Sequence, residues 1–179
     1  MTGQVVVPPL LVIVPRAEWA VRDATFPLFT QDVTRIVTHH TVTNATALDR
    51  NLGVMTIAQV VRDMETDHVN RQGWPGLGYH FVIGYDGTIF EGRPMDVRGN
   101  HAMRGRPYDR NPFTIGVALI GDFRPGNEPP SQAQLDSLFH ITSYILDNVP
   151  TIDTIECHWD TYFGPWYSSV QDELREKLR

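Results

Sequence analysis

The segment at residues 78–92, with the sequence GYHFVIGYDGTIFEG, constrains the fold more strongly than any other part of the chain. Two apolar runs meet there at Asp86-Gly87, and an Asp-Gly pair in this setting is a strong signal for a β-hairpin. Because a lone hairpin is at best marginally stable in water, it must pack with further strands or helices. The segment therefore predicts a sheet that contains an antiparallel pair of strands.

The segments around the hairpin carry a mixture of strand and helix patterns. Runs rich in β-branched and apolar residues predict three more strands, at 34–43, 113–121 and 153–158. Helical patterns predict three helices, at 56–72, 131–149 and 166–179. The first two begin with the predicted caps Thr56–Gln59 and Ser131–Gln134. The predicted fold is therefore α/β: a single domain with a central mixed β-sheet flanked by helices on both faces.

Length and charge limit the class of protein. A chain of 179 residues has the size of one domain with its own core. Residues 1–15 are predicted to form an extended arm ahead of a domain at 16–179, because Pro8 and Pro9 interrupt an apolar run that is too short to span a bilayer. The net charge of −6 argues against nucleic acid or an anionic membrane as the main partner.

Two of the seven histidines, His39 and His158, lie at the ends of predicted strands, where open sheets place their ligands. Side chains alternate along a strand, so His39 and His40 must face opposite sides of the sheet. Neutral imidazole is a good zinc ligand, and a catalytic zinc usually takes three protein ligands. The single cysteine, Cys157, excludes an internal disulfide and is either a ligand, a nucleophile or a buried core residue.

Several segments together resemble a known family. RAEWAVR, IVTHHTVT, the run at 67–102, TIGVALIGDF and HWD occur in this order. They are similar to the peptidoglycan recognition proteins and the type 2 zinc-dependent N-acetylmuramoyl-L-alanine amidases, which include phage endolysins. The resemblance runs from about Arg16 to the end, and 73–101 is its most specific part. It implies a zinc cleft on one face of the sheet and cleavage of the amide between N-acetylmuramic acid and L-alanine.

The resemblance also implies roles for individual residues. His39 and His158 match the first two zinc ligands, and Tyr79 matches a catalytic tyrosine near the metal, where a phenol can donate to the oxyanion. Four positions match residues that line the cleft and bind peptidoglycan: His68, Trp74, Arg93 and His101. Three of these residues also have a structural alternative. Tyr79 could be a core residue, Trp74 could end the helix before it, and Arg93 could form a surface ion pair with Glu91 or Asp96.

The loop after the second histidine departs from the family pattern. Relatives carry a cysteine there as the third zinc ligand, and the corresponding position in this chain is Gly164. The threonine or lysine that assists catalysis in relatives falls on Tyr162. Asp160 is the tentative third ligand, with Cys157 and Asp172 as the alternatives. Without a third ligand, the two histidines would bind zinc much more weakly.

The leading prediction is therefore a zinc-dependent amidase that hydrolyses peptidoglycan. With no visible signal peptide, it would be made in the cytoplasm and act on the cell wall after release, as a phage lysin does, or act outside the cell. The alternative is a catalytically degenerate module that binds peptidoglycan and does not cut it. A third possibility is a structural component of a larger particle that uses the fold as an adaptor.

Overall fold

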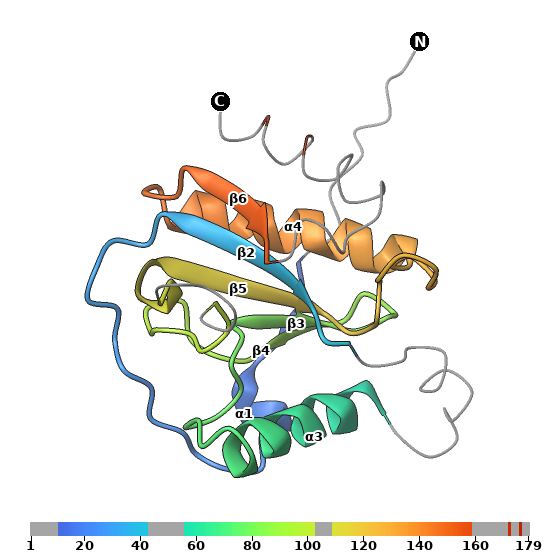
Figure 1. Ribbon diagram of the computed structural model, residues 1–179, viewed down its shortest axis with the longest axis horizontal. Helices are drawn as coiled ribbons and strands as arrows, with labels where there is room; N and C mark the ends of the chain where they lie inside the picture. Colours follow the sequence, from blue (N-terminus) through green and yellow to red (C-terminus); the bar gives the residue numbers. More distant parts are fainter. Residues whose placement is uncertain (1–10, 43–55, 103–108, 159–171, 173–175, 177–179) are drawn as a thin grey trace.

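The computed structural model describes residues 11–42, 56–102, 109–158, 172 and 176. The strands described there form one sheet in the order β1-β4-β3-β5-β2-β6 (Figure 1). Their bounds are β1 Ile13–Val14, β2 Arg35–His40, β3 Phe81–Ile83, β4 Ile89–Glu91, β5 Thr114–Leu119 and β6 Thr154–Cys157. The helices are α1 Arg16–Trp19, α3 Ile57–Asn70, α4 Gln132–Asn148 and the 3₁₀ helix η1 Asn111–Phe113.

The sheet is mixed, as predicted. Strand β2 pairs in parallel with both β5 and β6, and β3 pairs in parallel with β5. The predicted hairpin is confirmed as the antiparallel pair β3–β4. In its turn, Gly87 has a φ of +88°, and the Asp86 carboxylate accepts hydrogen bonds from the backbone and hydroxyl of Thr88. Residues 13–14 of the predicted arm pair with β4, whereas residues 1–10 lie outside the described part of the chain.

Helices cover both faces of this sheet, again as predicted, with α3 and α4 on opposite sides (Figure 1). Side chains alternate along each strand, so β1, β3, β4 and β5 contribute to two separate cores, whereas β2 and β6 contribute apolar side chains only to the core beneath α4. The core beneath α4 contains Ile36, Ile83, Ile115, Leu138 and Ile141. The core beneath α3 contains Trp19, Val61, Leu77, Val82 and Ala118. A residue's position along its strand therefore decides which helix its side chain faces.

The helix ends agree with the predicted caps except in one detail. Ser131 and Gln134 form a reciprocal capping box at the start of α4. Thr56 accepts a hydrogen bond from the Gln59 N–H, but the Gln59 side chain donates to Asp63 instead of returning to the cap. The second half of that predicted box is therefore wrong, because a carboxylate one turn along the helix competes for the Gln59 amide.

The chain passes from α3 toward the hairpin through a glycine, as predicted. Helix α3 ends at Asn70, and Gly73 takes a φ of +68°, which few other residues adopt without strain. The Trp74 N–H then donates to the carbonyl of His68 at 3.1 Å. Within the described residues, none of the helices is both long and apolar enough to cross a membrane. The predicted helix at 166–179 lies outside the described residues, apart from positions 172 and 176.

Candidate functional site

The rings of His39 and His158 meet at one end of the sheet because of the register between β2 and β6. The two strands run parallel with Thr38 opposite Cys157, and the His158 N–H continues the ladder by donating to the Thr38 carbonyl at 3.0 Å. His39 and His158 therefore lie side by side, with ring centroids 4.6 Å apart. Both are buried, with 4% and 8% of their surface exposed. Two imidazoles separated by more than a hundred residues in the sequence thus form one buried pair.

His40, the other histidine of β2, belongs to the opposite face, as the alternation predicts. Its Nδ1 accepts a hydrogen bond from the Phe123 N–H at 3.1 Å, and its ring lies 6.2 Å from that of Phe123. Phe123 is part of the core beneath α4, whereas Ala118, the partner of His39 in β5, is part of the core beneath α3. The buried histidine pair therefore opens toward the α3 side of the sheet.

Two more rings surround His39. The Tyr79 ring lies 5.2 Å from it, and the His101 ring lies 4.9 Å from it. The contact with His101 is direct, because Nε2 of His39 is 2.9 Å from Nδ1 of His101. The sequence predicts that His101 lines a substrate groove, but only 8% of its surface is exposed. The structure places it against a predicted metal ligand instead.

His68 and Trp74 form the neighbouring part of the site. Their rings are 4.6 Å apart, and the His68 ring lies 5.8 Å from that of Tyr79. Nδ1 of His68, on α3, accepts a hydrogen bond from the Gly78 N–H at 3.1 Å. A side chain at Gly78 would meet the Trp74 ring at 2.8 Å, so this close approach requires a glycine. Both rings are half-buried and adjoin the histidine pair through Tyr79.

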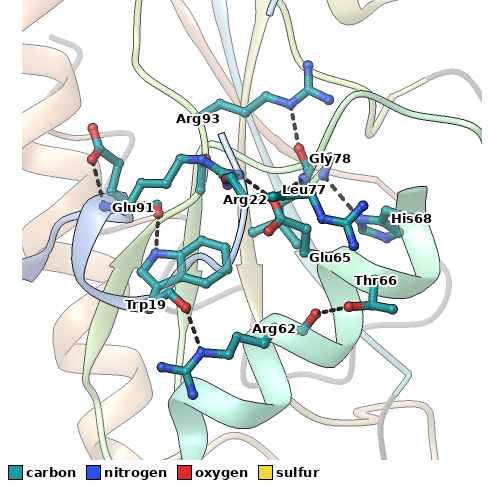
Figure 2. Close-up of polar contacts among 12 residues, drawn as sticks. Trp19, Arg22, Arg62, Glu65, Thr66, His68, Leu77, Gly78, Glu91 and Arg93 are labelled. Carbon is teal, nitrogen blue, oxygen red and sulfur yellow. Dashed lines mark hydrogen bonds and ion pairs between the residues drawn. The ribbon is translucent and has the colours of Figure 1, made fainter. Parts of the chain in front are cut away.

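The segment that leads into Tyr79 is held from behind by buried charges. Glu65 of α3 accepts a hydrogen bond from the Leu77 N–H at 3.1 Å, and Arg93 Nε donates to the Leu77 carbonyl at 2.5 Å (Figure 2). Glu65 also pairs with Arg16 at 2.6 Å. Glu65 is 1% exposed and Arg93 is fully buried. Both polar groups of one backbone residue, two positions before Tyr79, are thus fixed by charged side chains.

Arg93 is therefore not where the sequence analysis placed it. Its guanidinium donates to the Arg98 carbonyl at 2.6 Å and lies 4.4 Å from the centre of the Phe26 ring. With no exposed surface, the side chain is out of reach of a carboxylate in the peptidoglycan stem, and it forms no surface pair with Glu91 or Asp96. Burial lowers the pKa of Arg93 to about 10, so the group still carries its charge at neutral pH.

Sequence reasoning missed Glu65 and Arg16 as members of this scaffold. The available signal was the position of Glu65 one turn after Val61, on the apolar face of α3. A charged residue on a buried face requires a partner. The N-terminal segment supplies it, and Trp19 strengthens the docking through a hydrogen bond from its indole N–H to the Glu91 carbonyl at 2.8 Å (Figure 2).

Burial sets the charge state of the site. Desolvation, followed by the neighbouring histidines, lowers the pKa of His39 well below its usual value, and burial does the same to His101. Burial lowers the pKa of His68 to about 4 and raises that of Tyr79 to about 12. At pH 7 the imidazoles of His39, His68 and His101 are therefore neutral, and the Tyr79 phenol keeps its proton.

This donor chemistry fits a zinc ion at His39 and His158, because zinc binds neutral imidazole nitrogen. Within the described residues, however, no group of three His, Cys, Asp or Glu side chains is placed to hold a metal. Cys157 is buried on a strand position that alternates with His158, and Asp172 is exposed. The predicted ligand Asp160, together with Gly164 and Tyr162, lies outside the described residues. A third protein ligand would have to come from outside the described residues.

The buried histidines predict a loss of stability in mild acid. His80 is fully buried, its Nε2 lies 2.9 Å from the Val97 carbonyl, its Nδ1 accepts from the Gly116 N–H, and burial lowers its pKa to about 4. Because the unfolded chain binds protons at histidine near pH ~6.5, stability should fall between about pH 6.5 and about pH 4. His80 alone should contribute about 2 kcal/mol between pH 7 and pH 5. Urea unfolding at pH 7 and at pH 5 measures the difference in the free energy of unfolding. Equal free energies at the two pH values would contradict the prediction.

Comparison with known proteins gives the family. The model of the N-acetylmuramoyl-L-alanine amidase family, Amidase_2, matches residues 29–163. A peptidoglycan-recognition protein of Drosophila melanogaster is 37% identical over 122 residues, which are 67% of this chain and 60% of the relative. The chain thus spans about 60% of the length of that curated relative.

Solved structures agree with this result. N-acetylmuramoyl-L-alanine amidase LysC from Clostridium intestinale is 29% identical with a TM-score of 0.64, and the match covers 93% of this chain and 97% of LysC. Drosophila PGRP-LB is 26% identical with a TM-score of 0.69, covering 89% and 92% of the two chains. The sheet, the buried histidine pair and these matches together show that the chain belongs to the type 2 N-acetylmuramoyl-L-alanine amidase family, which includes the peptidoglycan recognition proteins.

Proposed function

We propose that this chain is a zinc-dependent amidase that hydrolyses the bond between N-acetylmuramic acid and L-alanine in peptidoglycan. The observation that carries the proposal is the buried, side-by-side pair His39 and His158 with the Tyr79 ring next to it. A surface that only binds a glycan has no need of two such rings, whereas a hydrolytic metal centre does.

In this proposal His39 and His158 hold the zinc, with a third ligand from the segment at 159–171. When bound, zinc supplies a Lewis acid for amide hydrolysis. The Tyr79 hydroxyl, which keeps its proton at neutral pH, donates a hydrogen bond to the scissile carbonyl oxygen as negative charge develops on it. Because these groups are largely shielded from water, their electrostatic interactions are stronger than they would be on an open surface.

His68 and Trp74 are proposed to bind the muropeptide beside this centre. Nδ1 of His68 accepts from the Gly78 N–H, so in the neutral ring the proton is on Nε2, which can donate to a carbonyl or hydroxyl of the ligand. Trp74 offers a flat apolar surface for a sugar ring. Arg93 has no place in this binding surface, because it is fully buried.

The second candidate function is a module that recognises peptidoglycan without cutting it. Gly164 at the position of the family's cysteine ligand favours it. The relatives named as recognition proteins are compatible with either function. In both cases we propose that the site of action is the cell wall, reached by release from the cell or by secretion.

Zinc content and wall digestion separate the two functions. The purified protein is expected to carry about one zinc per chain and to release soluble peptide from cell walls. Treatment with a chelator should stop the release, and added zinc should restore it. Protein that sediments with intact walls and releases nothing, with or without added zinc, would show the binding module instead.

A further inference from the structure

The direct contact between His39 and His101 has a consequence for the proposed metal site. Nε2 of His39 and Nδ1 of His101 are 2.9 Å apart, and both rings are buried. A hydrogen bond at this distance needs one proton between the two nitrogens, so one ring donates and the other accepts. Which ring donates decides which nitrogen of His39 keeps a lone pair.

The other side of His101 settles the direction. Its Nε2 lies 3.4 Å from the carbonyl of Thr114, and a carbonyl oxygen only accepts. The proton of the neutral His101 ring is therefore on Nε2, and its Nδ1 is an acceptor. His39 must then donate from Nε2, which leaves the lone pair of His39 on Nδ1. The hydrogen bonds run in one direction, from His39 to His101 to Thr114.

The backbone holds the His101 ring in the position that this requires. An added Cβ at Gly99 would lie 2.4 Å from the ring, and one at Gly116 would lie 2.6 Å from it. The backbone at both glycines therefore packs closely against the ring and restricts its position. The N–H groups of His101 and Ala102 both donate to the Asn111 side chain, at 2.7 and 2.9 Å. The ring is therefore enclosed and its backbone is anchored.

We propose that His101 is a positioning residue that fixes the tautomer and orientation of His39, so that Nδ1 of His39 is the nitrogen presented to the metal. The metal-binding part of this inference rests on the proposed function; the tautomer part does not. The corresponding arrangement is general in metal sites, where a partner of the distal ring nitrogen orients the ligand and its loss weakens metal binding. His101 acts here through His39 and touches neither metal nor substrate in this role.

The tautomer is measured directly on the metal-free wild-type protein by long-range ¹H–¹⁵N NMR of the histidine rings. The His39 signals are assigned by their absence in His39→Gln. Proton on Nε2 and a bare Nδ1 in His39 are expected. A proton on Nδ1 of His39 would overturn the inference, whatever the zinc affinity turns out to be.

Two substitutions of similar shape test the effect on the metal. His101→Asn keeps an acceptor near the position of Nδ1, whereas His101→Leu removes it and leaves the His39 N–H without its partner. Zinc affinity, measured by competition with a chromophoric chelator, should fall by roughly 10- to 100-fold in the leucine variant and much less in the asparagine variant. Equal affinities in the wild type and both variants would overturn the inference.

Gly116→Ala provides a second route that leaves every histidine in place. The new methyl group would displace the His101 ring, so the same loss of zinc affinity is expected, with circular dichroism to check the fold. If the wild type binds no zinc, the proposed function fails, and the NMR result alone decides whether His101 fixes the His39 tautomer.

Discussion

Alanine at His158 or at His39 is expected to weaken zinc binding strongly and to abolish hydrolysis of peptidoglycan. The two rings meet at 4.6 Å, and each would supply one of about three protein ligands. If the binding free energy of about 10 kcal/mol is shared among the ligands, losing one costs about 3 kcal/mol, a weakening on the order of 100-fold. Zinc content after dialysis and the release of soluble peptide from cell walls measure the two losses.

His40→Asn is the matched control for this pair of substitutions. It changes a histidine of the same strand that faces the α4 side, and the asparagine oxygen can still accept from the Phe123 N–H. Zinc content and hydrolysis should stay near the wild-type values. If His158→Ala still digests cell walls, or if His40→Asn loses zinc as His39→Ala does, the proposed metal centre is wrong.

Glu65→Ala is expected to lower the free energy of unfolding by about 3 kcal/mol, because removal of one partner of a buried ion pair leaves the other uncompensated. Glu65 is 1% exposed on its side chain and its partner Arg16 is 13% exposed. The substitution also leaves the Leu77 N–H without its acceptor, two residues before Tyr79. Urea unfolding measures the effect, and hydrolysis should fall as the Tyr79 ring loses its fixed position.

Two further variants show which interaction of Glu65 accounts for the loss of stability. Glu65→Gln keeps an acceptor for Leu77 and removes only the charge, so its loss should be smaller than that of Glu65→Ala. Asp67→Asn removes an exposed ion pair, in which the side chains of Asp67 and Arg71 are 43% and 80% exposed. This substitution should lower the free energy of unfolding by less than about 1 kcal/mol. A Glu65→Ala protein as stable as Asp67→Asn would show that the buried pair contributes little.

Most of the sheet could be predicted from local patterns, because all of its described strands except β1 have a signal within a few residues; β1 lies in the segment predicted to be an extended arm. Asp86-Gly87 between apolar runs predicts the hairpin, and the pattern of the run at 34–43 predicts a buried strand. The meeting of His39 with His158 was different. The predicted strand ends placed each ring at one end of the sheet. Only the parallel register of β2 and β6, a long-range feature, brings the two rings together.

Arg93 and His101 show where the sequence was insufficient. The sequence predicts that both contact peptidoglycan, yet Arg93 is enclosed by backbone carbonyls and Phe26, and His101 hydrogen-bonds to His39. A charged or polar residue type does not state whether its partner is a ligand or a buried group of the same chain. That distinction depends on packing, which brings together residues that are distant in the sequence.

The central claim, that His39 and His158 hold one metal ion, is tested most directly by anomalous diffraction at the zinc absorption edge from a crystal of the zinc-loaded protein. One strong anomalous peak between the two imidazole rings, with a protein atom from residues 159–171 beside it, is the predicted result. A map with no peak between these rings, or with zinc bound only elsewhere on the protein, would contradict the account.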